Sequence, residues 1–179
     1  PRAGRSFAGV PPFTLAEYHP TARDAAGSFR HFMREHFLDH VDIPPRQIHI
    51  PDGSLPAERV AAHCREYEQA IRASGGIDLQ VLGIGSNGHI GFNEPASPRD
   101  SRTRLVELHG QTRLDNAAAF GGAELVPRHA ITMGIGTILE GRALLVLAFG
   151  AATAAALRAA LLGPIDESLP ASLLRTHRQ

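Results

Sequence analysis

The sequence predicts an α/β fold: one domain over residues 1–179, with a mostly parallel, Rossmann-like sheet flanked by helices on both faces. Strand-like and helix-like stretches alternate along the chain, with no internal repeat or linker. Two apolar runs, residues 77–85 and 142–150, each end in glycine, as parallel strands do beside a ligand site. The length of 179 residues, 43% of them hydrophobic, suits one domain with a sizeable core.

The N-terminal part is predicted to hold a short strand, a helix and an extended segment. Residues 11–18 (PPFTLAEY) favour a strand followed by a loop. Residues 28–41 space their apolar side chains as one face of a helix does. Residues 47–50 (QIHI) are expected to be extended.

The second predicted helix has recognisable ends. Ser54 is expected to be its N-cap, with Pro56 early in the first turn, and the pair Gly75–Gly76 is expected to stop it. Its buried face should carry Val60, Cys64, Tyr67 and Ile71. Residues 77–85 and 142–150 then read as buried strands, and residues 151–163 as a helix.

Composition excludes several classes of function. The chain has 18 Lys+Arg and 18 Asp+Glu, so nothing in its charge favours nucleic acid or a membrane surface as a partner. All the basic residues are Arg, which excludes a lysine Schiff base. Cys64 is the only cysteine, which excludes an intramolecular disulfide and predicts a buried thiol. No apolar run reaches the roughly 18 residues of a membrane span, and we expect a cytoplasmic protein.

Residues 83–95 (GIGSNGHIGFNEP) contain the candidate site. Gly85 and Gly88 permit a tight turn and close approach of a ligand, although such glycines also occur in turns that bind nothing. His89 can exchange a proton near neutral pH, and Glu94 can orient its ring and stabilise its charged form. Asn87 offers an amide to sugar-like hydroxyls, or is present for its backbone tolerance. The stretch predicts a general acid–base pair on a glycine-rich loop.

One alternative is a metal site. His36 and His40 are spaced i and i+4 on the first predicted helix, a spacing that can bind Zn²⁺. The pair alone does not complete a ligand set, and we do not expect a metal.

Residues 82–95 (LGIGSNGHIGFNEP) closely resemble the signature of the glucosamine-6-phosphate deaminases. The 6-phosphogluconolactonases have a similar glycine–histidine turn, but GFNEP and TMGIGTIL look like the deaminase branch. Similar segments follow the family's order: FMREHFLDHVDIP (32–44), SRTRLVEL (101–108), QTRLDNAAAF (111–120), VPRHAITMGIGTIL (126–139) and LLGPIDESLPASLLRTH (161–177).

The resemblance implies a reaction. Members open the ring of glucosamine 6-phosphate, isomerise it through an enolamine and release ammonia to leave fructose 6-phosphate, with no metal or organic cofactor. His89 is implied as the ring-opening acid–base catalyst, Glu94 as its carboxylate partner, and Asn87 stands where members have Asp or Asn. Oligomeric members exist, so a homo-oligomer is one expected state. Contacts with the sugar phosphate are expected from Gly85, Ser86, Gly88 and Arg104.

Three positions depart from the family pattern. In the motif LDEY the Asp is the base of the isomerisation, but this chain reads LAEY with Ala16 at that position. Neighbouring Glu17 should point to the opposite face of the strand. Two cationic phosphate partners are replaced by Ala118 and Thr153. The family's phosphate-binding loop would precede Pro1, so we expect an N-terminally incomplete domain.

These departures keep two other functions open. One is a catalytically impaired homologue that binds sugar phosphates or acts as a non-catalytic subunit of an oligomer. The other is a 6-phosphogluconolactonase-like hydrolase, which needs no carbon base.

Overall fold

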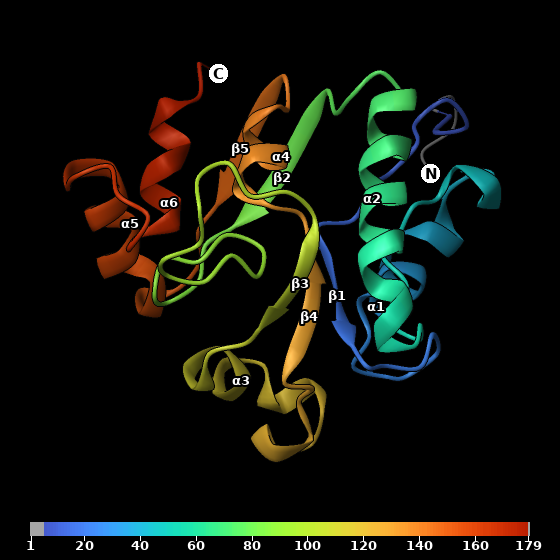
Figure 1. The fold of residues 1–179 in the computed structure, drawn as a ribbon, viewed down its shortest axis with the longest axis horizontal. Coiled ribbons are helices and arrows are strands. Elements are labelled where there is room, and N and C mark those ends of the chain that lie inside the picture. Colours follow the sequence, from blue (N-terminus) through green and yellow to red (C-terminus); the bar gives the residue numbers. More distant parts are fainter. Residues whose placement is uncertain (1–5, 179) are drawn as a thin grey trace.

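A computed structural model describes residues 6–178 (Figure 1). Strands alternate with helices along it, which confirms the α/β class; the region expected before Pro1 lies outside the described residues. The strands are β1 (Ala16–His19), β2 (Leu79–Gly83), β3 (Arg104–Glu107), β4 (His129–Thr132) and β5 (Ala143–Leu147). The helices are α1 (Phe29–His36), α2 (Ala57–Ala73), α3 (Gly110–Asp115), α4 (Ile135–Leu139), α5 (Ala154–Leu162) and α6 (Pro170–Leu173).

The sheets differ from the single, mostly parallel sheet that the sequence predicts. One sheet has three antiparallel strands in the order β1-β4-β3, and the other pairs β2 with β5 in parallel. An apolar run shows that a strand exists but not which way its neighbour runs. Here the connection between β3 and β4 folds back through α3, so these strands become antiparallel neighbours.

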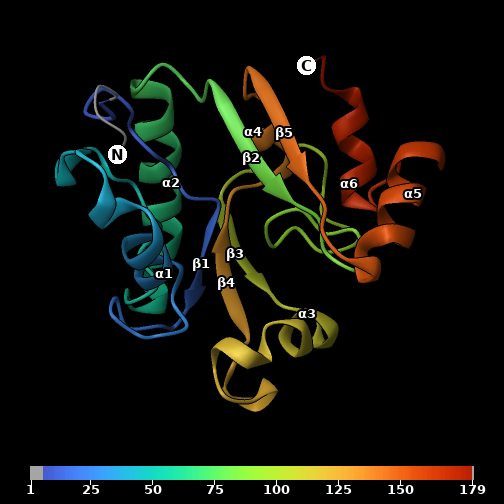
Figure 2. The ribbon, with the colours of Figure 1, turned by 180° about the vertical axis from the view of Figure 1, so that it is seen from behind.

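The β2–β5 pair is covered on only one face in the described chain, whereas helices were expected on both. Leu82 faces a core shared with Tyr67 and Ile71 of α2 and with residues of α4, α5 and α6. The opposite face is open in Figure 2. Its apolar side chains are between 40% and 55% exposed: Leu79, Val81, Leu145 and Leu147. The parallel register pairs Val81 with Leu145 and thus makes this surface continuous.

Helix α2 confirms the sequence prediction most closely. Its buried residues include all four that were expected, and it ends just before Gly75 and Gly76, which both have positive φ. Cys64 is buried, and burial raises the pKa of its thiol to about 11, as expected for a structural thiol. Ser54 is not the N-cap: Pro56 occupies that position, and the Ser54 hydroxyl donates to Asp52 instead.

The first helix is shorter than the pattern predicts. Helix α1 ends at His36, and His40 lies in a separate 3-10 turn, Leu38–His40. The His40 ring bonds to the carbonyl of Glu35. The two histidines therefore do not share one helix, and the i, i+4 spacing loses its meaning as a metal pair. The segment 47–50 is extended only in part, because a 3-10 turn reaches Gln47 and a single bridge joins His49 to Phe13.

Glu17 of β1 is buried and bound to the start of α1. Its carboxylate accepts hydrogen bonds of 2.9 Å from the backbone N–H groups of Tyr18, Phe29 and Arg30. Burial raises the pKa of Glu17, and these bonds oppose that rise. A carboxylate at a helix N-terminus also complements the helix dipole. Glu17 is thus a structural residue that connects β1 to α1.

Replacing Glu17 by Ala is expected to lower the free energy of unfolding by about 3 kcal/mol, because three N–H groups, one buried and two part-buried, lose their acceptor. Glu17→Gln keeps one acceptor oxygen and should lose less. Chemical denaturation measures both, with Glu35→Ala as a control on the same helix, where the side chain is 59% exposed. Equal stability of Glu17→Ala and the control would show that these bonds contribute little.

No helix among residues 6–178 is both long enough and apolar enough to cross a membrane.

Candidate active site

The glycine-rich loop begins where β2 ends, and its glycines make room for His89. A Cβ on Gly85 would lie within 2.5 Å of three atoms of the His89 ring. Gly88 has a φ of +81°, which favours glycine. The N–H of Gly85 donates to the His89 carbonyl, and that of Gly88 donates to the Gly85 carbonyl, each at 3.0 Å. The role that the structure shows for both is steric, and their contact with a substrate stays a prediction.

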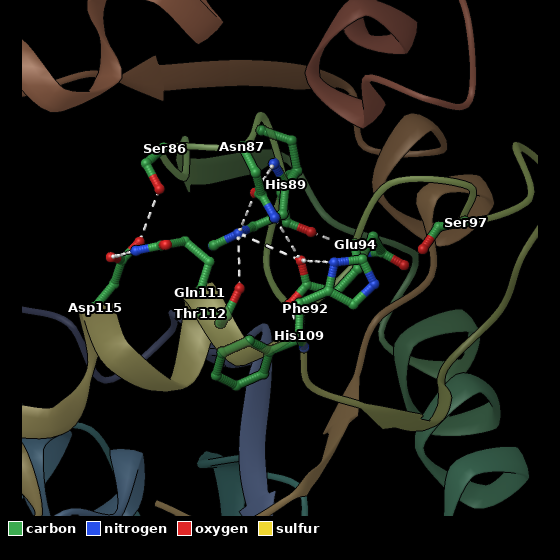
Figure 3. A network of polar contacts seen from close by, with 12 residues as sticks. Ser86, Asn87, His89, Phe92, Glu94, Ser97, His109, Gln111, Thr112 and Asp115 are labelled. Atoms are coloured by element: carbon green, nitrogen blue, oxygen red, sulfur yellow. Dashed lines mark hydrogen bonds and ion pairs between the residues drawn. The ribbon is translucent and has the colours of Figure 1, made fainter. Parts of the chain in front are cut away.

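The three residues predicted to be catalytic lie together (Figure 3). Oδ1 of Asn87 is 2.8 Å from Nδ1 of His89, and Nδ2 of Asn87 donates to Oε2 of Glu94 at 2.9 Å. Nδ1 of His89 and Oε2 of Glu94 are 3.7 Å apart. Asn87 must direct its amide N–H to the carboxylate, which only accepts, so its oxygen receives the proton on Nδ1 of His89. This relay, His89–Asn87–Glu94, leaves Nε2 as the basic nitrogen of the neutral ring.

The surroundings keep His89 neutral near pH 7. Burial lowers the pKa of His89, and the carboxylates of Glu94 and Asp115 oppose this shift. A neutral imidazole can accept a proton from a hydroxyl and then return it, with Glu94 stabilising the charged ring in between. The relay can therefore perform general acid–base chemistry between two oxygens.

Helix α3 contributes side chains that the sequence analysis did not single out. Asp115 accepts hydrogen bonds of 2.8 Å from the Ser86 hydroxyl and from the amide of Gln111. The hydroxyl of Thr112 lies 3.5 Å from Nδ1 of His89. Ser86 thus joins the loop to α3, and its expected contact with substrate stays a prediction. The sequence signal for the contact between Gln111 and Asp115 was their i, i+4 spacing, which places two side chains on the same face of a helix.

His109 is a second imidazole at the relay, and the sequence analysis missed it. Its Nδ1 is 3.7 Å from Oε2 of Glu94, the same distance as Nδ1 of His89, and its backbone N–H donates to Oε1 of Glu94 at 3.2 Å. Figure 3 shows the Glu94 carboxylate between the two rings. The side chain of His109 is 50% exposed, whereas that of His89 is 15% exposed.

Arg104 and Arg113 make internal contacts near the loop. The guanidinium of Arg104 donates to Oδ1 of Asn93 at 2.8 Å and to the Ser97 hydroxyl at 3.2 Å. Arg104 therefore holds the segment that follows His89, and its contact with substrate stays a prediction. Arg113 donates to the carbonyls of Ala123 and Val126, within the connection between β3 and β4.

The three positions that depart from the family pattern lie in different places. Ala16 pairs with Thr132 of β4 and is buried in an apolar cluster with Phe92 and Leu108. Ala118 lies exposed in a 3-10 turn after α3. The Thr153 hydroxyl donates to the carbonyls of Phe149 and Gly150 before α5. In residues 6–178, no group of three or more ligating side chains is placed to hold a metal ion.

The family model that describes glucosamine-6-phosphate isomerases and 6-phosphogluconolactonases matches residues 20–179. The chain belongs to this family. Within it, a glucosamine-6-phosphate deaminase of Corynebacterium urealyticum is 48% identical over 99% of this chain and 68% of its own length. Another, from Shouchella clausii, is 46% identical over 97% of this chain and 70% of its own length.

Solved structures agree with this membership of the isomerase/lactonase family. A monomeric glucosamine-6-phosphate deaminase superposes with a TM-score of 0.94 at 42% identity, over 97% of this chain and 71% of that one. A 6-phosphogluconolactonase of Thermotoga maritima reaches 0.67 at 21% identity, over 95% of this chain and 76% of that one, which shows a shared fold alone. The predicted resemblance to the deaminases is confirmed.

Proposed function

We propose that this chain is a glucosamine-6-phosphate deaminase, which converts glucosamine 6-phosphate and water to fructose 6-phosphate and ammonia. The observation that carries the proposal is the relay of His89, Asn87 and Glu94. It stands in a chain 46–48% identical to relatives named for this activity. The lactonase alternative is supported by less, because the lactonase structure from Thermotoga maritima is 21% identical.

The relay suits the opening of a sugar ring. Nε2 of His89 takes the proton of the anomeric hydroxyl, the bond between C1 and the ring oxygen breaks, and the same nitrogen returns the proton to that oxygen. Asn87 holds the ring in one tautomer, and Glu94 stabilises the imidazolium while it exists. The lowered pKa of His89 favours the neutral starting state.

The later proton transfer between carbons needs a further base. Ala16 has a methyl group where the family pattern has a carboxylate, and Glu17 is committed to the N-terminus of α1. The relay therefore supports ring opening, whereas the proton transfer between carbons needs a base other than the residue at the family position.

The test measures both steps on glucosamine 6-phosphate. Anomer exchange, followed by NMR saturation transfer, reports ring opening, and a coupled assay reports ammonia. His89→Ala should slow both by about 100-fold or more. The control is His31→Ala, a half-exposed histidine on α1 that should leave both rates unchanged. Ring opening and ammonia release that persist in His89→Ala would contradict the proposal.

A second candidate is a homologue that binds sugar phosphates without turnover. The replacements at Ala16, Ala118 and Thr153 favour it, since each removes a charged group expected from the family pattern. Binding of glucosamine 6-phosphate in calorimetry, with no anomer exchange above the uncatalysed rate, would support this candidate over the first.

The proposed activity also implies a partner, a pathway and a compartment. The partner is a small sugar phosphate, the pathway is amino-sugar breakdown, and the compartment is the cytoplasm, as expected for a chain with one cysteine. A homo-oligomer stays a prediction, and sedimentation of the purified chain would test it against the monomer described for the structural relative.

A further inference from the structure

The proposed ring-opening steps do not use His109, although its ring lies beside Glu94 of the relay. Its ring and that of His89 approach the same carboxylate oxygen of Glu94, each at 3.7 Å (Figure 3). The His89 ring is nearly buried, and the His109 side chain is 50% exposed. Of the two imidazoles, His109 is therefore the one more open to a molecule arriving from solvent.

The backbone on both sides of His109 is held in place. The N–H of Leu108 donates to the Arg128 carbonyl at 2.8 Å, and the carbonyl of His109 accepts the first-turn bond of α3 from Arg113 at 3.0 Å. The N–H of His109 itself is bound to Glu94. These bonds fix the backbone from which the imidazole projects, and proton transfer to carbon requires a positioned base.

His109 directly follows a residue that packs with Ala16, the position of the absent base. Leu108, the residue before it, packs in one apolar cluster with Ala16 and Phe92. Phe92 is only two residues from Glu94. The relay and the position of Ala16 are thus joined through one apolar cluster, and Leu108 connects His109 to that cluster.

The carboxylates near the relay already accept hydrogen bonds from other groups of the chain. Glu94 is 5% exposed and accepts from Asn87 and from the N–H of His109. Asp115 accepts from Ser86 and Gln111, and these bonds lower its pKa and make it a weaker base. Glu17 is buried at the start of α1. His109 differs from Glu94 and Glu17, which are buried, because its side chain is 50% exposed, and from Asp115, whose carboxylate already accepts two hydrogen bonds.

We propose that His109 is the second proton-transfer group of this site and moves the proton between C2 and C1 that Ala16 cannot move. The inference rests on the proposed function. After ring opening, neutral His109 takes the proton from C2, the C2–H electrons form the C1=C2 bond, and the C1=O π electrons move to the aldehyde oxygen. That oxygen takes a proton from water and leaves hydroxide, which the proton released from nitrogen later neutralises. The imidazolium then protonates C1 as C2 becomes an imine and nitrogen releases a proton to solvent. Water adds to C2, and ammonia leaves.

The experiment separates the carbon step from ring opening. Glucosamine 6-phosphate is incubated in D₂O with the wild type, His109→Gln and the control His31→Gln. Exchange of the C2 proton and ammonia release report the carbon step, and saturation transfer between anomers reports ring opening. His109→Gln should slow C2 exchange and ammonia release by about 100-fold or more and leave anomer exchange within about threefold of wild type. His31→Gln should change none of these rates.

A rescue variant distinguishes chemistry from structure. Ala16→Asp in the His109→Gln background supplies a carboxylate at the family position. The double variant should exchange the C2 proton at least tenfold faster than His109→Gln alone. Undiminished C2 exchange in His109→Gln would overturn the inference. So would equal loss of anomer exchange and C2 exchange, which would mean that His109 only supports Glu94. Wild type that opens the ring without C2 exchange overturns the role of His109 but not that of His89, and wild type that does neither overturns the proposed function too.

Discussion

Replacing Gly85 by Ala is expected to slow ring opening by about 100-fold. The added Cβ would meet Cε1, Nδ1 and Nε2 of His89 at 2.2, 2.3 and 2.5 Å, so the imidazole must leave its place. A displaced ring loses the Asn87 contact that orients its basic nitrogen. Catalysis by a positioned acid–base group depends steeply on position, and a shift near 1 Å is enough to remove most of its effect.

Gly83→Ala is the matched control, because it adds the same methyl group two residues earlier. A Cβ there meets no atom within 4 Å, and Gly83 has no positive φ. Anomer exchange of glucosamine 6-phosphate measures both variants, and thermal unfolding checks that both are folded. A Gly85→Ala protein that opens the ring as fast as Gly83→Ala would show that the position of His89 in this structure is not the one that reacts.

Replacing Glu68 by Ala is expected to lower the free energy of unfolding by about 3–5 kcal/mol, the largest stability effect that we predict, because three buried donors each lose their acceptor. Glu68 of α2 is 5% exposed, and it joins three parts of the fold. Oε1 accepts from the N–H and hydroxyl of Thr103 and from the hydroxyl of Thr137, and Oε2 accepts from Arg102 at 2.7 Å. Removing the carboxylate leaves buried donors without an acceptor.

The control is Glu140→Ala, which removes the other acidic partner of Arg102. The Glu140 side chain is 62% exposed, so its loss should lower the free energy of unfolding by less than about 1 kcal/mol. Chemical denaturation at pH 7 compares the two variants. Similar losses would show that the buried network around Glu68 contributes no more than an exposed ion pair.

The Glu68 carboxylate also predicts that the stability of the fold depends on pH. Burial opposes ionisation of Glu68, but hydrogen bonds from Thr103, Thr137 and Arg102 outweigh it and hold the pKa below its ordinary value of 4.5. The stability from this network is therefore complete above pH 4.5 and is lost as the pH falls through the folded-state pKa. The wild type should lose stability more steeply than Glu68→Gln in that window. Parallel curves would assign the acid sensitivity to other groups.

Local patterns in the sequence were enough to predict several elements and the residues of the relay. The apolar spacing and terminal glycines of α2 predicted a helix that the structure confirms, because such a helix buries one periodic face whatever it packs against. His89, Asn87 and Glu94 lie within eight residues, so a single loop brings them together with little help from the rest of the chain. Family membership followed from the same residues.

The sequence by itself thus determined the α/β class, the family and the identity of the relay. Only the tertiary structure decided the direction of the strands, the binding of Glu17 to α1 and the approach of His109 and Asp115 to the relay. The physical reason is the separation along the chain of the residues that interact. A hydrophobic period or a turn glycine acts on neighbours in the chain, whereas strand pairing and the contacts of His109 join residues 15 or more positions apart. Which distant groups meet depends on how the whole core packs.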